Sequence, residues 1–182
     1  MADIPKPYKM IVDFVTGREI PEVGAEANRQ AVAKFLIEGK GFAREDIEVD
    51  VAIAFDVAGK AYRSQVDLVV SVGEDRTRYM AIKCAAGSLG SCEREILAAA
   101  RLLEQYQIPL SVASDGNTAI VIDTVSGKKN GEGMDAIPDK SQALERLKQI
   151  TLQPYPKERI ERERLIFRTY NCEYVNIARN LP

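Results

Sequence analysis

The sequence contains no histidine and no tryptophan, and it has only three cysteines in 182 residues. Without histidine, a Ser-His-Asp or Cys-His mechanism and a histidine-ligated zinc site are excluded. Proton transfer must then rely on carboxylates, lysine, tyrosine, cysteine or water. A metal site must consist mostly of oxygen ligands, which favours Mg2+, Mn2+ or Ca2+ over zinc.

The cysteines and the apolar segments indicate where the protein works. Cys84, Cys92 and Cys172 are odd in number and lack Cys-x-x-Cys spacing, which argues against a disulfide framework and favours a reducing compartment. No segment has the pattern of a signal peptide, and no apolar run is long enough to span a bilayer. We therefore expect a soluble, cytoplasmic protein without a membrane partner.

Length and charge set further bounds. A chain of 182 residues is long enough for a domain with a hydrophobic core of its own. Its 25 lysine and arginine residues nearly balance 27 aspartate and glutamate residues, for a formal net charge of -2. This balance argues against a nonspecific binder of polyanions, but it leaves room for a local basic patch.

Hydrophobic periodicity predicts a mixed α/β fold. Val32, Phe35 and Leu36 form an apolar stripe with helical spacing, whereas residues 47–53 alternate with the period of a strand. Three successive strand patterns joined by short turns predict an antiparallel meander. A helix between the third and fourth strands then requires a crossover, and therefore a mixed sheet with helices on its faces.

In chain order, the patterns predict a strand at 8–15, a helix at 25–39, strands at 47–53, 65–72 and 78–84, a helix at 92–107, strands at 110–113 and 119–123, a loop at 125–138, and helices at 141–152 and 156–168. We expect an α/β domain at 1–150, with an N-terminal β extension at 1–23, followed by a C-terminal helical tail at 151–182.

Several short motifs follow one another along these elements. They are Glu-Ala-Asn-Arg-Gln at 26–30, Val-Asp-Leu-Val-Val at 66–70, Met-Ala-Ile-Lys-Cys at 80–84, the helix at 92–106, and Pro109 before the next strand. Over residues 19–143 this order resembles the restriction-endonuclease-like core of the PD-(D/E)XK nuclease superfamily. In closer detail it resembles the N-terminal nuclease domain of type I restriction enzyme R subunits.

The resemblance implies a phosphodiester hydrolase that acts on DNA with Mg2+ or Mn2+. Asp67 stands where the family has its first metal-binding aspartate, and the carbonyl of Ile82 would be another metal ligand. Lys83 stands where the family has its catalytic lysine, which orients the attacking water and stabilises charge on the phosphate. The residues alone also allow a solvent-facing Asp67 and a Lys83 that protects an exposed edge strand.

One position departs from the family pattern. The family has a glutamate or aspartate two residues before the lysine, and this chain has Ala81 there. Glu26, on the first helix, is one replacement and would be a catalytic carboxylate. Glu95 is the other and would be a metal ligand, with Glu93 as the neighbouring choice. For Glu93 and Glu95, placement at a helix N-terminus is an alternative explanation.

Other residues are candidates for contact with nucleic acid. Arg29 and Gln30 lie on the first helix, and Arg94 lies on the second. Ser88 and Ser91 belong to a Gly- and Ser-rich segment whose backbone amides would bind a phosphate, although it is not a Walker A loop. Ser91 is also the predicted N-cap of the second helix. The alternatives are a solvated helix face and an ordinary connector.

The last predicted helix is strongly charged. Residues 157–168 carry five Lys or Arg and three Glu, a net charge of +2. This stretch would contact phosphates, or it would pack against a second copy or a partner subunit through Leu165, Ile166 and Phe167.

Three functions remain open at this point. The first is a divalent-metal-dependent DNA endonuclease-like domain, a stand-alone version of the nuclease module. The second is a catalytically inactive nuclease fold that serves nucleic-acid binding or assembly, which Ala81 and the balanced charge favour. The third is an unrelated α/β domain that binds a small ligand or phosphate through the Gly- and Ser-rich segment.

Overall fold

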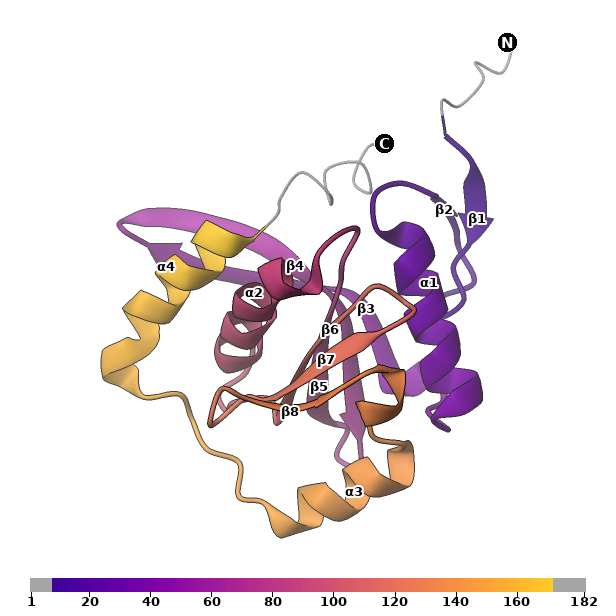
Figure 1. Ribbon diagram of the computed structural model, residues 1–182. Coiled ribbons are helices and arrows are strands. Elements are labelled where there is room, and N and C mark those ends of the chain that lie inside the picture. Colours follow the sequence, from indigo (N-terminus) through magenta and orange to yellow (C-terminus); the bar gives the residue numbers. More distant parts are fainter. Residues whose placement is uncertain (1–7, 172–182) are drawn as a thin grey trace.

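The structure is a computed structural model that describes residues 8–171 as a mixed α/β fold (Figure 1). It contains a six-stranded sheet, a separate two-stranded hairpin and four α-helices. The strands are β1 (Met10–Val12), β2 (Glu19–Pro21), β3 (Ile47–Val57), β4 (Lys60–Val72), β5 (Thr77–Cys84), β6 (Leu110–Ser114), β7 (Ala119–Asp123) and β8 (Lys128–Glu132). The α-helices are α1 (Glu26–Lys34), α2 (Leu89–Leu102), α3 (Lys140–Gln149) and α4 (Ile160–Tyr170). Helix α1 continues as a π-helix at Phe35–Gly39. Short 3-10 helices lie at Arg44–Asp46, Met134–Ala136 and Lys157–Arg159.

The large sheet has the mixed topology that the sequence predicts. Its strand order is β3-β4-β5-β6-β7-β8. Strands β3, β4 and β5 form an antiparallel meander, and β5 pairs with β6 in parallel. Helix α2 connects these two strands, because a parallel pair needs a crossover rather than a tight turn. Strands β7 and β8 extend the sheet in antiparallel fashion.

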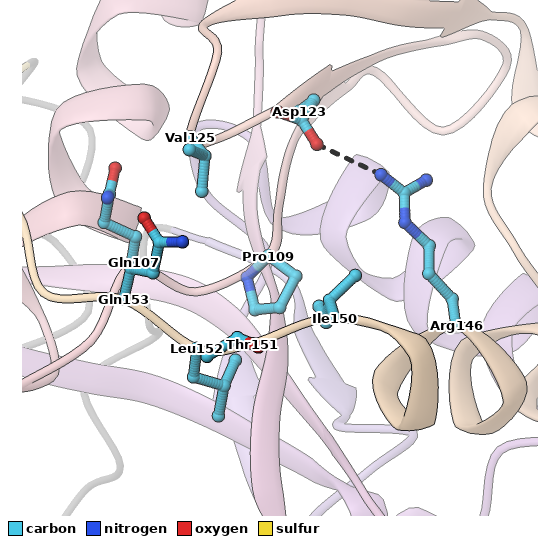
Figure 2. A pocket seen from close by; sticks show the side chains of 9 residues that line it. All are labelled: Gln107, Pro109, Asp123, Val125, Arg146, Ile150, Thr151, Leu152 and Gln153. Carbon is cyan, nitrogen blue, oxygen red and sulfur yellow. Dashed lines mark hydrogen bonds and ion pairs between the residues drawn. The ribbon is translucent and has the colours of Figure 1, made fainter.

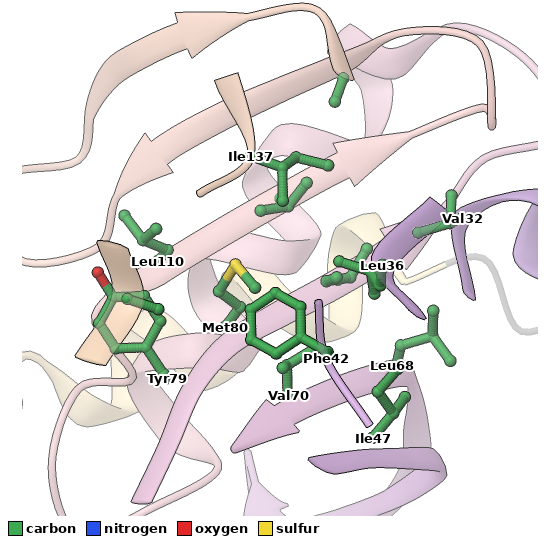
Figure 3. Close-up of a cluster of buried hydrophobic side chains, with 14 of the residues drawn as sticks. Val32, Leu36, Phe42, Ile47, Leu68, Val70, Tyr79, Met80, Leu110 and Ile137 are labelled. Carbon is green, nitrogen blue, oxygen red and sulfur yellow. The ribbon is translucent and has the colours of Figure 1, made fainter. Parts of the chain in front are cut away.

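Two layers of helices cover the sheet. On one face, α1 and α3 pack over a cluster that includes Leu68, Val70 and Met80 (Figure 3). On the other face, α2 and α4 pack over a cluster that includes Val69 and Ala81. The parallel centre of the sheet is therefore buried on both sides, as its apolar strands require.

Strand β8 and the ends of α2 differ from the predictions. Strand β8 lies within residues 125–138, where the sequence predicts a loop. Its sequence Lys-Lys-Asn-Gly-Glu gives no strand pattern, because it is polar and almost fully exposed. Helix α2 begins at Leu89 rather than Cys92 and ends at Leu102 rather than Gln107. The predicted N-cap at Ser91 is therefore wrong, because Ser91 lies within the first turn and its hydroxyl donates to the Ser88 carbonyl at 2.7 Å.

The C-terminal helix packs against the rest of the domain. Helix α4 lies on α2 and beside β3, at the outer part of the long β3–β4 hairpin (Figure 1). The Phe167 ring is 1% exposed and meets the rings of Phe55 and Tyr62 edge to face, with centroids 5.8 and 6.1 Å apart. The expectation that Phe167 packs against a second copy is therefore wrong, because this side chain belongs to the core. Residues 172–182 of the predicted tail lie outside the described residues.

Among residues 8–171, no helix combines the length and the apolar character that a bilayer crossing requires.

The turn between β6 and β7 gives the first testable prediction. Gly116 has φ +88°, and a Cβ there would lie 2.9 Å from the Ala31 Cβ and 3.3 Å from the Asn28 carbonyl oxygen. Gly116→Ala is expected to lower the free energy of unfolding by about 2–4 kcal/mol, since backbone strain and overpacking add. Urea denaturation measures this loss.

Gly59→Ala is the matched control for that substitution. Gly59 has a similar φ of +73°, and a Cβ there would meet nothing within 4 Å. Its loss should be confined to strain, about 1–2 kcal/mol. Equal losses for the two variants would show that the close approach to α1 contributes nothing.

Candidate active site

Three buried ionisable side chains from three different elements meet at one end of the sheet. Asp67 lies on β4, Lys83 on β5 and Glu95 on α2, and they are 1%, 4% and 2% exposed. The Lys83 Nζ lies 3.0 Å from the Glu95 Oε1 and 3.7 Å from the Asp67 Oδ2. We call these three residues the Asp-Lys-Glu cluster.

The register of the sheet brings Asp67 and Lys83 together. Leu68 pairs with Ile82, so Asp67 and Lys83 lie next to each other just beyond the last paired residues of β4 and β5. Val69 and Ala81 face α2, and strand alternation places Asp67 and Lys83 on the same side. The two polar residues therefore point toward α2 rather than into solvent.

The backbone around Asp67 is irregular on both sides. Strand β4 pairs with β3 through Val66 and Leu68, but the pairing omits Asp67 and the opposite Asp50, whose φ is +52°. On the other side, the Cys84 N–H donates to the Asp67 Oδ2 at 2.7 Å. A side-chain carboxylate thus accepts a main-chain donor where β4 and β5 no longer pair.

Of the two predicted replacements for the missing carboxylate, Glu95 is the one that forms an ion pair with Lys83. Ala81 is fully buried on the α2-facing side of β5, two residues before Lys83. Glu95 approaches the same lysine from α2. Glu26 instead belongs to a second buried cluster, which consists of Asp13, Glu26 and Arg29. Its Oε1 lies 2.6 Å from an Arg29 nitrogen. Glu93 is half-buried in the first turns of α2.

The electrostatics of the cluster keep the lysine charged. Burial lowers the pKa of Lys83, but attraction from Asp67 and Glu95 outweighs it and raises that pKa to about 12. Burial raises the pKa of Glu95, and the nearby Lys83 ammonium offsets this only in part. Two carboxylates thus share one ammonium group at the end of the sheet.

A residue that the sequence did not single out completes the surroundings of Glu95. Asn171, directly after α4, donates from its Nδ2 to the Glu95 Oε1 at 2.8 Å. Its Oδ1 accepts hydrogen bonds from the Tyr62 hydroxyl at 2.7 Å and the Ser64 hydroxyl at 2.9 Å. Asn171 carries no sequence signal for this role, because only the fold brings α4 back to α2.

The two α1 residues predicted to contact nucleic acid face the protein interior. Arg29 is 1% exposed and pairs with Asp13 at 2.5 Å and with Glu26. Gln30 is half-buried and donates to Asp13 at 3.0 Å and to Glu26 at 2.7 Å. Arg29 therefore lies in the interior rather than on a solvated helix face, because its guanidinium binds two carboxylates of the chain itself. These contacts join α1 to the turn that follows β1. The contact of Arg29 with nucleic acid stays a prediction.

The buried Asp13 shows how strong this second cluster is. Burial pushes the pKa of Asp13 upward, but hydrogen bonds from the Thr16 N–H and Gln30, together with Arg29, outweigh this effect. The pKa of Asp13 is lowered to about 2.

The other predicted contact residues lie at the start of α2. Ser88, Ser91 and Arg94 are exposed, and the Arg94 guanidinium stacks on the Tyr170 ring at 5.0 Å from its centroid. The Ile82 side chain lies in the core on the α1 side of the sheet, so only its main chain is available to the Asp-Lys-Glu cluster. Contacts of these residues with DNA or metal stay predictions.

A cavity of about 320 Å3 lies away from this cluster (Figure 2). Pro109 and Asp123 line it where β6 begins and β7 ends. Lys83, by contrast, pairs with Ala113 near the other end of β6. Asp123 forms an ion pair with Arg146 at 3.0 Å in this cavity. The cavity and the Asp-Lys-Glu cluster are therefore at opposite ends of the strands.

The Asp-Lys-Glu cluster contains carboxylate oxygens, the type of ligand that Mg2+ and Mn2+ prefer. Among residues 8–171, no group of three or more His, Cys, Asp or Glu side chains is arranged to hold a metal ion. Mg2+ does not need such a group, because it usually keeps several waters and takes one or two carboxylates. The Glu95 Oε2 is buried and has no hydrogen-bond partner, so it is an oxygen ligand that a cation would satisfy.

The fold and this cluster define an α/β domain with a carboxylate-and-lysine site. A family model described as the N terminus of the type I restriction enzyme R protein matches residues 24–138, more than half of the chain. The chain belongs to this family. The matched region includes Asp67, Lys83 and Glu95 but not Asn171. No curated protein and no solved structure matches the chain.

Proposed function

We propose that this protein is a divalent-metal-dependent DNA endonuclease of the PD-(D/E)XK superfamily. The observation that carries the proposal is the Lys83 ammonium, which is buried between the carboxylates of Asp67 and Glu95. Carboxylates can hold a divalent cation for phosphodiester hydrolysis, and a lysine beside them can stabilise the charge that develops on the phosphate. Membership of the restriction enzyme R protein family supports DNA as the substrate.

Each residue of the cluster has a chemical role in this proposal. Asp67 and Glu95 would hold Mg2+ or Mn2+, with the Ile82 carbonyl as a further candidate ligand. The cation, when bound, supplies Lewis-acid polarisation of the scissile phosphate. Lys83 positions the attacking water by hydrogen bonding and stabilises the negative charge that develops on the phosphate oxygens. Glu95 thereby replaces the carboxylate that the family has at the position of Ala81.

Cleavage of linear and supercoiled DNA in Mg2+ or Mn2+ tests the proposal. The wild-type protein should cleave, and Asp67→Asn should reduce the rate to background, because it removes a negatively charged ligand. Asp56→Asn is the matched control, since Asp56 is exposed on β3. A Mn2+ titration should show a site that Glu95→Gln weakens strongly.

A catalytically inactive nuclease fold for nucleic-acid binding or assembly is the second candidate. The observation that favours it is that Lys83 already neutralises part of the charge of the two carboxylates. It predicts neither Mn2+ binding nor cleavage by the wild-type protein. It also predicts that Asp67→Asn leaves DNA binding unchanged.

A further inference from the structure

The side-chain amide of Asn171 is held in one orientation. Its Oδ1 accepts two hydrogen bonds, from the hydroxyls of Tyr62 and Ser64, and its Nδ2 therefore points to the Glu95 Oε1. Tyr62 and Ser64 lie two residues apart on β4, the strand that carries Asp67, so they share a face of that strand. A rigid strand thus fixes the amide.

The Tyr62 side chain that holds Asn171 is itself fixed by packing. The Tyr62 ring lies against Phe55 and Phe167, at centroid distances of 5.9 and 6.1 Å. Phe167 comes from α4, and the Asn171 N–H donates to the Phe167 carbonyl at 2.8 Å as the helix ends. The last turn of α4 therefore places the amide over Glu95.

The two oxygens of Glu95 differ in their surroundings as a result. The Oε1 lies 3.0 Å from the Lys83 Nζ and accepts from Asn171 at 2.8 Å. The Oε2 is buried without a hydrogen-bond partner. A carboxylate that is anchored through one oxygen presents the other in a fixed direction.

We infer that Asn171 is a positioning residue for Glu95, which it orients so that the Oε2 binds the divalent cation. This inference rests on the proposed function. Hydrogen-bond partners that orient a metal-binding carboxylate typically change metal affinity about 10- to 100-fold when they are removed. The metal site would then require a residue from outside the region that the family model matches.

A double-mutant cycle on Mn2+ affinity, measured by electron paramagnetic resonance of free Mn2+, tests this role. Asn171→Ala should raise the Mn2+ dissociation constant about 10-fold or more. In a Glu95→Gln background the same substitution should change the constant by less than about 2-fold, because the group that it orients is gone. Tyr62→Phe keeps the ring packing and should give a smaller increase in the same direction.

Asn117→Ala is the matched control, because Asn117 is exposed in the β6–β7 turn; its dissociation constant should equal that of the wild type. If Asn171→Ala lowers thermal stability but leaves Mn2+ affinity unchanged, or if the effect persists in Glu95→Gln, the positioning role is overturned while the proposed function stands. If the wild-type protein binds no Mn2+, the proposed function fails and this inference fails with it.

Discussion

Lys83→Met is expected to reduce DNA cleavage by about 100- to 1000-fold while it tightens the binding of Mn2+. The loss of rate follows from the removal of the charge that stabilises the phosphate in the transition state. The gain in affinity follows because the Lys83 ammonium lies 3.0 and 3.7 Å from the two carboxylates that the cation needs. Cleavage rates and Mn2+ titrations on the same preparation measure both effects.

The same substitution should affect stability in a metal-dependent way. Without the ammonium group, two carboxylates remain buried near each other, and the free energy of unfolding should fall by about 3–5 kcal/mol. Added Mn2+ should restore part of this loss, since it binds the folded state. Lys60→Met is the control, because Lys60 is exposed at the start of β4. Wild-type cleavage by Lys83→Met would remove the lysine from the proposed mechanism.

Arg29→Met is expected to lower the free energy of unfolding by about 3–5 kcal/mol. Arg29 is buried between Asp13 and Glu26, so its removal leaves two carboxylates in the interior with one countercharge fewer. Urea denaturation measures the loss. Arg63→Met, at an exposed position of β4, should change the stability by less than about 0.5 kcal/mol.

The same variant also distinguishes a structural role of Arg29 from the role in DNA binding that the sequence predicts. A phosphate contact would make Arg29→Met weaken DNA binding and flatten its salt dependence without any loss of stability. The buried ion pairs predict the reverse, a large loss of stability and an unchanged salt dependence. Measurements of DNA affinity at two salt concentrations, below the unfolding midpoint of the variant, decide between them.

The arrangement of the sheet was predictable because it depends on local patterns. Alternating apolar residues mark β3, apolar runs mark β4 and β5, and a helix between two strands requires the parallel pairing of β5 with β6. Strand β8 was not predictable in this way, since its residues are polar and its place in the sheet depends only on pairing with β7. The first turn of α2 was missed because Gly90 and Ser91 are typical of a loop.

The candidate site was predictable only in part. Asp67 and Lys83 stand out because a charged residue interrupts an apolar strand in each case. The choice between Glu26 and Glu95 was not predictable, since both lie near the start of a helix and only the packing of α2 on the sheet separates them. The role of Asn171 was not predictable, because no pattern in the sequence indicates that α4 packs against α2.

Because β8 is polar, its sequence lacks a strand pattern, and the same polar composition protects the edge of the sheet against aggregation. A strand at the edge of a sheet exposes a row of unpaired main-chain groups on which another chain can add a strand and begin to aggregate. Lys128 and Lys129 are exposed on β8, and each would have to lose its hydration for a foreign strand to approach. Replacing them with valine would improve the strand pattern and, at the same time, open this side of the molecule to edge-to-edge association.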